Sequence, residues 1–268
     1  MRSNFLQVVS VPKTIALNLK TYAESTGENA LALTEAADAA AKDFPAVQVI
    51  AAVQAPELRW ICDKKFAYAK IFAQHADSNP QGAFTGSVTL EAIKASGAAG
   101  TLLNHAEKKV LLTDAAKTIS RANALGLQTI ACAKDVLEGE ALAELKPTAV
   151  AVEPPELIGS GVSVSKARPE VVQNAVKKIK HANPKVQVLV GAGVSTPEDV
   201  RKCFELGAEG VLLASAFVKA KEPEQWLREA LEALSEAEET KLAESLVERS
   251  LEQSKVVDEK TLKNALHK

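Results

Sequence analysis

The chain has 268 residues, of which 47% are hydrophobic and 25% charged, a balance typical of folded globular proteins that excludes a disordered chain. The formal net charge of −2 provides no basic surplus for binding nucleic acid or an anionic membrane. No run of about 18 apolar residues is present, so we expect no transmembrane helix. One barrel domain commonly has about 250 residues, so the length fits a single domain.

The cysteines indicate a reducing compartment. Cys62, Cys132 and Cys203 are odd in number and far apart in the sequence. This spacing is neither a disulfide framework nor a zinc-binding pattern, so we expect reduced thiols that serve in packing, in a cytoplasmic protein. The segment 1–12 also lacks the apolar core of a signal peptide.

Eight short apolar runs recur along the chain, each nearly continuous rather than alternating with polar residues. Such runs are typical of strands buried on both faces of a parallel sheet. In chain order, the predicted strands are Thr14–Leu19, Gln48–Val53, Lys70–Gln74, Gly100–Leu103, Gln128–Cys132, Thr148–Val152, Gln187–Val190 and Gly210–Leu213.

Segments with helical spacing of apolar residues lie between these strands. We predict helices over Ala30–Lys42, Asp114–Leu125, Pro169–Ala182 and Thr196–Leu206. Asp114 is a candidate N-cap and Gly126 a candidate stop, whereas Thr196 to Asp199 has the pattern of a capped helix start with proline in its first turn. Strands that alternate with helices predict βαβ units and a parallel sheet.

The predicted sheet has two possible architectures. Eight strands in this order fit a closed (β/α)8 barrel. An open, doubly wound sheet is the alternative, and it would place a GxGxxG turn after the first strand. Lys20-Thr21-Tyr22-Ala23 stands there instead, which favours the barrel.

The C-terminal segment differs from the rest of the chain. Between Ser235 and Lys268 there is no glycine, proline, phenylalanine, tyrosine or tryptophan, and apolar residues recur four positions apart. This pattern predicts one or two amphipathic helices. We therefore expect one domain over residues 1–268, with the barrel at about 12–234 and a helical C-terminal extension at about 235–268.

Functional residues of a parallel barrel lie where its strands end. Polar residues follow three of the predicted strands: Asn18 and Lys20, then Asn104, His105 and Glu107, then Glu153. A glutamate, a histidine and a lysine together suit proton abstraction beside a carbonyl, with the latter two stabilising an enediolate. Turns at Gly159, Gly193 and Ala214-Ser215 can present backbone N–H groups to an anion.

Each residue has an ordinary structural interpretation when taken alone. Glu153 can be a solvated loop carboxylate and Lys20 an exposed charge. His75 also ends a strand, and we expect it to be structural or at a subunit contact. His181 and His267 lie in polar helical stretches, where we expect them to face solvent. Only the shared position of the trio at one rim favours a site.

Six segments resemble motifs of the triosephosphate isomerase family, in particular its shorter archaeal type, and they occur in the family's order. The resemblance extends from about Ile15 to Pro223. The segments are Asn18-Leu19-Lys20, Gly82-Ala83-Phe84-Thr85-Gly86, Leu103 to Lys108, Ala151 to Gly161, Gly191 to Ser195 and Leu212-Leu213-Ala214-Ser215.

The resemblance implies an isomerase that interconverts dihydroxyacetone phosphate and D-glyceraldehyde 3-phosphate through an enediolate, in glycolysis and gluconeogenesis. It implies no metal and no organic cofactor. Glu153 would be the base, His105 a neutral electrophile and Lys20 a stabilising cation, and residues 154–161 would form a closing lid. The implied substrate-binding residues are Asn18, Leu19, Lys20, Ile158, Gly159, Gly193, Ala214 and Ser215.

The resemblance also implies a homodimer or homotetramer with Phe84, Thr85 and Gly86 at the subunit contact, and a small-molecule substrate as the partner rather than nucleic acid or membrane. Ala106 and Lys108 depart from the serine and arginine of many family members. Two alternatives stay open: another phosphate-binding barrel enzyme acting on a sugar phosphate, and a catalytically inactive barrel that serves as a phosphate sensor or scaffold.

Overall fold

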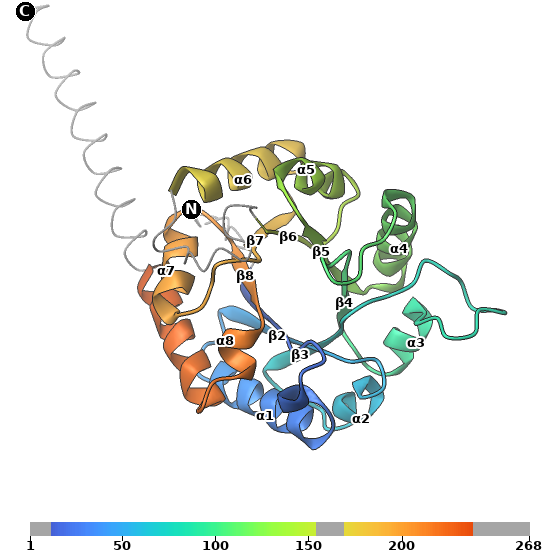
Figure 1. Ribbon diagram of the computed structural model, residues 1–268, viewed down its shortest axis with the longest axis horizontal. Helices are drawn as coiled ribbons and strands as arrows, with labels where there is room; N and C mark the ends of the chain where they lie inside the picture. The colour runs from blue at the N-terminus through green and yellow to red at the C-terminus, as the bar shows by residue number, and fades with distance from the viewer. Residues whose placement is uncertain (1–11, 154–168, 238–268) are drawn as a thin grey trace, which may run out of the picture.

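Eight parallel strands close into a barrel in the computed structural model, which describes residues 12–153 and 169–237 (Figure 1). Each strand pairs with its neighbours in chain order, and Thr14 of β1 pairs with Gly210 of β8 to complete the ring. The strands are β1 (Lys13–Asn18), β2 (Val47–Val53), β3 (Ala69–Ala73), β4 (Gly100–Leu103), β5 (Gln128–Ala133), β6 (Ala149–Val152), β7 (Gln187–Val190) and β8 (Gly210–Leu213).

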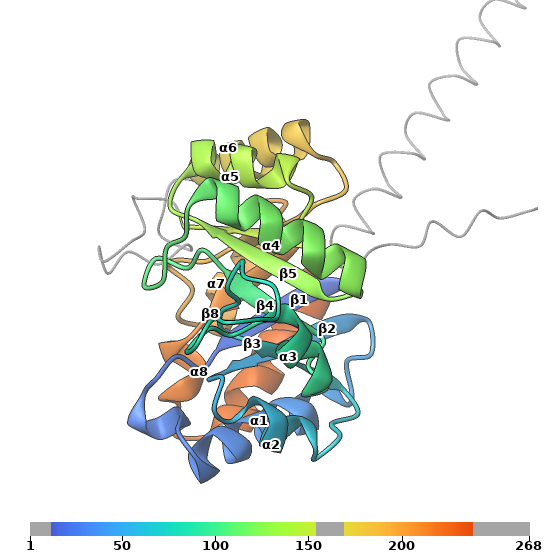
Figure 2. The same ribbon diagram turned by 90° about the vertical axis from the view of Figure 1, so that its right-hand side faces the viewer.

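Helices cover the outside of the barrel. Figure 1 shows them around the ring of strands, and Figure 2 shows from the side how α4 lies over β5. They are η1 (Ala23–Ser25), α1 (Glu28–Ala41), α2 (Leu58–Cys62), α3 (Leu90–Ala95), α4 (Leu112–Leu125), α5 (Val136–Glu144), α6 (Pro169–Ala182), α7 (Pro197–Glu205) and α8 (Ser215–Val218), followed by helical residues 223–237. Within the described ranges, none of the helices has the length and apolar character that crossing a membrane requires.

The predicted barrel and all eight predicted strands are confirmed. Gly100–Leu103, Gln187–Val190 and Gly210–Leu213 agree to the residue, and the other five differ by one residue at one or both ends. The four predicted helices correspond to α1, α4, α6 and α7. The helix α5 and the helical residues 223–237 were not predicted one by one, although they are as long as α7 or longer. A helix of four to six residues carries too little periodicity to detect. The short helices α2, α3 and α8 were accordingly not predicted one by one.

Helix ends test the capping predictions. Thr196 caps α7 as expected, and a reciprocal pair of hydrogen bonds with Asp199 forms a capping box. Gly126 ends α4 in the left-handed conformation. The prediction that Asp114 is an N-cap is wrong, because α4 begins earlier, after Leu111. Asp114 lies in the first turn, where its carboxylate accepts a hydrogen bond from the Ser78 hydroxyl at 3.0 Å.

The expected extension at about 235–268 lies almost entirely outside the described residues. Residues 223–237 are helical, and within this segment Leu227, Leu231 and Leu234 are fully buried. The helix therefore belongs to the barrel's outer layer, and the domain limits stay a prediction.

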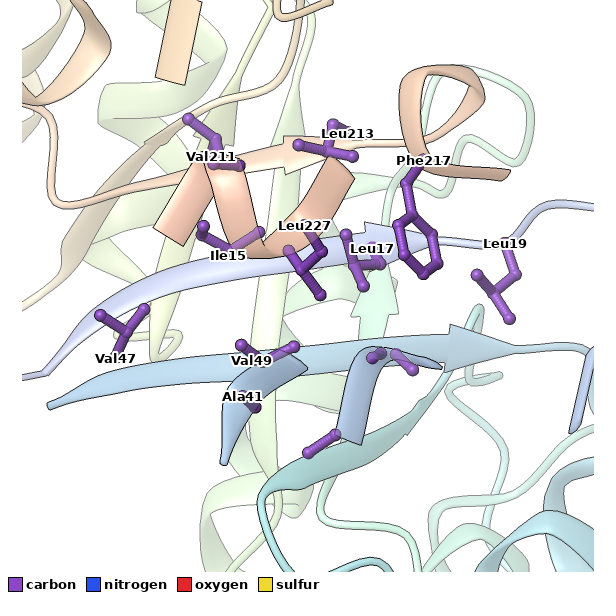
Figure 3. Close-up of a cluster of buried hydrophobic side chains, with 14 of the residues drawn as sticks. Ile15, Leu17, Leu19, Ala41, Val47, Val49, Val211, Leu213, Phe217 and Leu227 are labelled. Carbon is purple, nitrogen blue, oxygen red and sulfur yellow. The ribbon is translucent and has the colours of Figure 1, made fainter. Parts of the chain in front are cut away.

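Alternate residues of each strand pack in two different hydrophobic cores, one inside the barrel and one between the strands and the helices. One set points into the barrel, where small and large side chains interdigitate: Ala16, Ile50, Ala52, Phe72, Leu102, Ile130, Cys132, Ala149, Ala151, Leu189 and Leu212. The other set packs outward against helices, as Figure 3 shows for Ile15, Leu17 and Leu19 with Phe217 and Leu227. Burial on both faces explains why the strands read as continuous apolar runs.

Gly210 lets three strands approach closely. A Cβ atom there would lie 2.5 Å from the backbone oxygen of Thr14 and 2.8 Å from Leu189 Cγ. The oxygen belongs to the neighbouring strand and cannot move without breaking the barrel. We expect Gly210→Ala to lower the free energy of unfolding by about 2–3 kcal/mol, measured by urea denaturation.

Gly139→Ala is the matched control for this prediction. A Cβ at Gly139 would meet Ile179 Cδ1 at 2.9 Å, which is the free end of a flexible side chain. Since alanine also favours the helix, we expect a change below about 1 kcal/mol. Equal effects of the two variants would contradict the packing argument.

Candidate active site

A cavity of about 420 Å³ opens at the carboxyl ends of the strands. It gathers most of the residues singled out from the sequence, although they come from five different strand ends. Those that line it are Asn18, Lys20, His105, Glu153, Gly193, Ala214 and Ser215. Tyr22, Ala106, Glu107 and Gly191 are further lining residues.

Lys20 is held in an unusual backbone conformation just after β1, with φ of 53°. Its backbone N–H donates to Asn18 Oδ1 at 3.0 Å, and its carbonyl accepts from the Gln74 amide at 2.8 Å. Its ammonium forms an ion pair with Glu107 at 2.7 Å, and its side chain is 24% exposed. Groups from three different strand ends therefore hold Lys20: Asn18 and Gln74 bind its backbone, and Glu107 binds its ammonium.

His105 is oriented by the backbone of the turn that follows β4. Its Nδ1 accepts a hydrogen bond from the Glu107 N–H at 3.2 Å, so the proton of the neutral ring is assigned to Nε2. Burial lowers the pKa of His105 below its ordinary value of 6.5, and Lys20 and Lys109 add to this against the opposing effect of Glu107. The ring is consequently neutral at pH 7, with an N–H donor available to the cavity.

Glu153 follows β6 and faces that donor. Its Oε1 lies 4.0 Å from His105 Nε2, and only 12% of each side chain is exposed. Burial raises the pKa of the Glu153 carboxyl above its ordinary value of 4.5, although Lys20 and Lys109 oppose the shift. Gly191 leaves room for this side chain, since a Cβ there would lie 3.0 Å from Glu153 Cγ. A carboxylate of raised basicity is suited to removing a proton.

Two turns from the neighbouring strands β7 and β8 also line the cavity. Gly193 turns with φ of 72° after β7, and Ala214-Ser215 leads into α8 after β8. The N–H groups of Ser195 and Thr196 both donate to Asp199, so they already have a partner at the start of α7. Within the described residues, no cluster of three or more histidine, cysteine, aspartate and glutamate side chains has the arrangement of a metal site.

Comparison with known proteins identifies the family. The sequence model described as triosephosphate isomerase matches residues 13–230. The chain belongs to the triosephosphate isomerase family. It is 47% identical to the triosephosphate isomerase of Methanothermus fervidus over 215 residues, which cover 80% of this chain and 96% of the relative. It is 45% identical to the triosephosphate isomerase of Methanocaldococcus jannaschii, over 80% of this chain and 97% of that relative. It is 42% identical to that of Methanosarcina barkeri, over 80% of this chain and 96% of that relative.

Some residues expected to bind substrate on the basis of this family are placed differently or not described. The Leu19 side chain is 1% exposed and lies in the outer core beside Phe217, away from the cavity (Figure 3). The Leu19 side chain therefore does not reach the cavity, because it continues the alternation of β1 and points to the opposite face from Asn18. The expected contact of Leu19 with substrate stays a prediction. Ile158, Gly159 and the expected lid over 154–161 lie outside the described residues.

The remaining candidates lie away from the cavity lining. His75 Nε2 lies 3.1 Å from Asp77 Oδ1, at the base of the loop that carries Phe84, Thr85 and Gly86. His181 is exposed, as expected, and His267 lies outside the described residues. Cys132 is buried inside the barrel, which agrees with a packing role.

Sequence reasoning missed three features of the site. Glu107 was noted at the rim, but its pairing with Lys20 joins residues 87 positions apart. Gln74, which directly follows β3, was not singled out although its side-chain amide donates to the Lys20 carbonyl. Tyr22 lines the cavity and lies under Lys219, whose Nζ is 4.6 Å from the ring centroid. The position of Gln74 at a strand end was a usable signal for a site residue.

The two shifted pKa values predict how activity depends on pH. The Glu153 carboxyl accepts a proton only when ionised, so kcat/KM falls as the pH drops through its raised pKa. Protonation of His105 lowers kcat/KM as well. Because the pKa of His105 is lowered, this second loss occurs at a pH below 6.5. We expect a plateau around neutral pH and an acid limb with its first midpoint above 4.5, measured from kcat/KM between pH 4.5 and 9. An imidazolium signal from His105 at pH 7 in ¹⁵N NMR spectra would contradict the assignment.

Proposed function

We propose that this protein is a triose-phosphate isomerase, which interconverts dihydroxyacetone phosphate and D-glyceraldehyde 3-phosphate. The single observation that carries the proposal is the pair formed by His105 Nε2 and Glu153 Oε1, 4.0 Å apart over a cavity with Lys20 at its mouth. A base and a hydrogen-bond donor at this separation can address a C–H group and the oxygen of the adjacent carbonyl in one small molecule.

The reaction moves one hydrogen between adjacent carbons and needs no external oxidant or reductant. Glu153 removes the proton from the carbon that bears the hydroxyl group, and the electron pair forms the enediolate C=C bond while the neighbouring carbonyl oxygen gains negative charge. The His105 Nε2–H stabilises that oxygen. Glu153 then returns the proton to the other carbon, and the hydroxyl proton passes between the two oxygens, which gives the isomer.

Lys20 and the two turns hold the charged parts of the substrate in this proposal. The Lys20 ammonium offsets the negative charge of the phosphate ester and of the enediolate. The backbone at Gly193 and Ala214-Ser215 receives the phosphate, because glycine permits close approach and the start of a helix favours an anion. Asn18 supports this arrangement through its hydrogen bond to the Lys20 N–H.

A coupled assay with glyceraldehyde 3-phosphate tests the function. Dihydroxyacetone phosphate formed by the protein is reduced by an added dehydrogenase, and the loss of NADH is followed. We expect turnover well above that of a no-enzyme reaction. Absence of turnover with intact binding of inorganic phosphate would instead support a sensor or scaffold, and turnover of another sugar phosphate alone would support a different barrel enzyme.

We also infer that the protein is a homo-oligomer, a dimer or a tetramer, in a reducing compartment such as the cytosol. The loop with Phe84, Thr85 and Gly86 is exposed throughout, and the Phe84 side chain is 43% exposed. Asp77 fixes the loop base, since its N–H donates to the Val88 carbonyl and its carboxylate accepts from the Val88 N–H at 2.7 Å. A firmly anchored loop with an exposed aromatic tip is suited to binding another subunit.

Removal of the aromatic side chain tests this contact. We expect Phe84→Ser to shift the protein towards monomer in light scattering, because it deletes the apolar anchor. Tyr68→Ser is the matched control, since Tyr68 is an aromatic residue of similar exposure, 47%, outside this loop. A variant at Phe84 with unchanged mass would contradict the assigned contact.

A further inference from the structure

Asn104 occupies a demanding position between β4 and His105. Its backbone has φ of 59°, a left-handed conformation that asparagine tolerates better than most residues with a side chain. The residue is 3% exposed. Glycine would satisfy this conformation equally well, so the presence of a buried amide here needs another reason.

The Asn104 amide makes three hydrogen bonds. Its Nδ2 donates to the Cys132 carbonyl and to Glu138 Oε1, both at 2.9 Å. Its Oδ1 accepts from the Val110 N–H at 3.1 Å. The amide therefore closes the turn of residues 104–110, in which His105 lies, and ties it to the end of β5 and the first turn of α5.

Glu138 continues the connection. Besides Asn104, its carboxylate accepts from Lys109 Nζ at 2.8 Å and from the Lys134 N–H at 2.6 Å. Burial opposes ionisation, but the hydrogen bonds from Lys109, Lys134 and Asn104 outweigh it and lower the pKa of the Glu138 carboxyl. Asn104 at the start of the His105 turn and Lys109 near its end are thus both bound to one ionised carboxylate.

We propose that Asn104, Glu138 and Lys109 form a positioning cluster that fixes the turn carrying His105 and balances the charge behind Glu153. This proposal rests on the function proposed above. None of the three residues lines the cavity, so they act through His105 and Glu153 rather than on the substrate.

The cluster lies next to the base. The Glu153 N–H donates to the Ala133 carbonyl at 2.9 Å, and the N–H of the following residue, Lys134, donates to Glu138. Lys109 lowers the pKa of Glu153 and Glu138 raises it, so their effects oppose each other when both are present. The other titratable or charged groups that face Glu153 are Lys20 after β1, His105 and Glu107 after β4, and the Cys132 thiol in β5. Removal of either Lys109 or Glu138 leaves the charge of the remaining residue uncompensated, and this charge then shifts the pKa of Glu153.

Asn104→Asp is the decisive variant. It keeps the tolerance for the left-handed backbone and the acceptor for the Val110 N–H, but it places a carboxylate oxygen against the Cys132 carbonyl and Glu138. Because small displacements of a catalytic group cost much rate, we expect kcat to fall about 10- to 100-fold with KM within roughly threefold of wild type. Adding Glu138→Gln should restore part of kcat, since the amide introduced at position 138 can donate to the carboxylate introduced at position 104.

Asn183→Asp is the matched control. Asn183 has a similar pattern, donating to the Ala143 carbonyl at 3.0 Å and accepting from the Lys185 N–H at 3.1 Å, but it lies before β7 at the opposite end of the barrel. We expect its kcat to equal that of wild type. A kcat of Asn104→Asp within twofold of wild type, or a folded double variant that is no faster than Asn104→Asp, would overturn the positioning role.

The charge balance has its own readout. We expect Lys109→Met to move the Glu153 midpoint to higher pH and Glu138→Gln to move it to lower pH, in ¹³C NMR titrations of the carboxyl and in the acid limb of kcat/KM. Unchanged midpoints in both variants would overturn the charge balance at Glu153. If Asn104→Asp does not fold, the titrations of Lys109→Met and Glu138→Gln decide whether the cluster acts on the site. The NMR titration needs no turnover, so an inactive wild type would count against the proposed function alone.

Discussion

Glu153→Gln should reduce kcat by about a thousandfold or more while leaving the affinity for inorganic phosphate within about twofold. The amide has the shape of the carboxylate, but it cannot take a proton from carbon. His105, Lys20 and the turns at Gly193 and Ser215 remain, so the anion still binds. The coupled assay gives kcat, and competitive inhibition by inorganic phosphate gives the affinity.

Stability provides an internal control for this variant. Burial raises the pKa of the Glu153 carboxyl in the folded protein, so the ionised form present at neutral pH destabilises the fold relative to the protonated form. The neutral amide removes this cost, and we expect a Tm equal to or above that of wild type. Glu144→Gln, at the exposed end of α5, should change neither kcat nor Tm. Near-normal turnover by Glu153→Gln would exclude Glu153 as the base.

The fold could be predicted because the apolar composition of each strand indicates that the strand is buried. Runs such as Val47–Val53 and Ala149–Val152 are apolar at nearly every position, which burial on both faces explains, and a polar residue follows each of them. The N-cap prediction at Asp114 failed because the first turn also accepts acidic residues, so an aspartate there does not identify the cap. A local pattern locates a helix better than it locates the first residue of that helix.

The residues of the site could be predicted from the sequence, but the contacts between them could not. Strand ends indicated Asn18, Lys20, His105 and Glu153, because all carboxyl ends of a parallel barrel meet at one rim. The sequence could not reveal which of these groups touch. The contact of Lys20 with Glu107 and that of Asn104 with Glu138 depend on side-chain directions across neighbouring loops, which no spacing along the chain encodes.

Lys20→Met should lower kcat/KM by at least about a hundredfold, which corresponds to about 2.7 kcal/mol, with a higher KM and a lower kcat. Methionine keeps most of the length of the side chain and places no branched Cβ in the left-handed conformation at φ of 53°. The variant therefore removes the charge with little change of shape. Because the ammonium offsets both the phosphate ester and the enediolate, its loss weakens ground-state binding and transition-state stabilisation together.

Lys65→Met separates loss of charge from backbone strain. Lys65 has φ of 58° and is exposed outside the cavity, so it undergoes the same chemical change in the same backbone conformation. We expect its kcat and KM to match wild type. An unchanged KM in Lys20→Met would show that the ammonium makes no contact with the anionic substrate. The 2.7 Å ion pair with Glu107 would then be its principal role, and the charge that stabilises the enediolate would have to come from elsewhere at the rim.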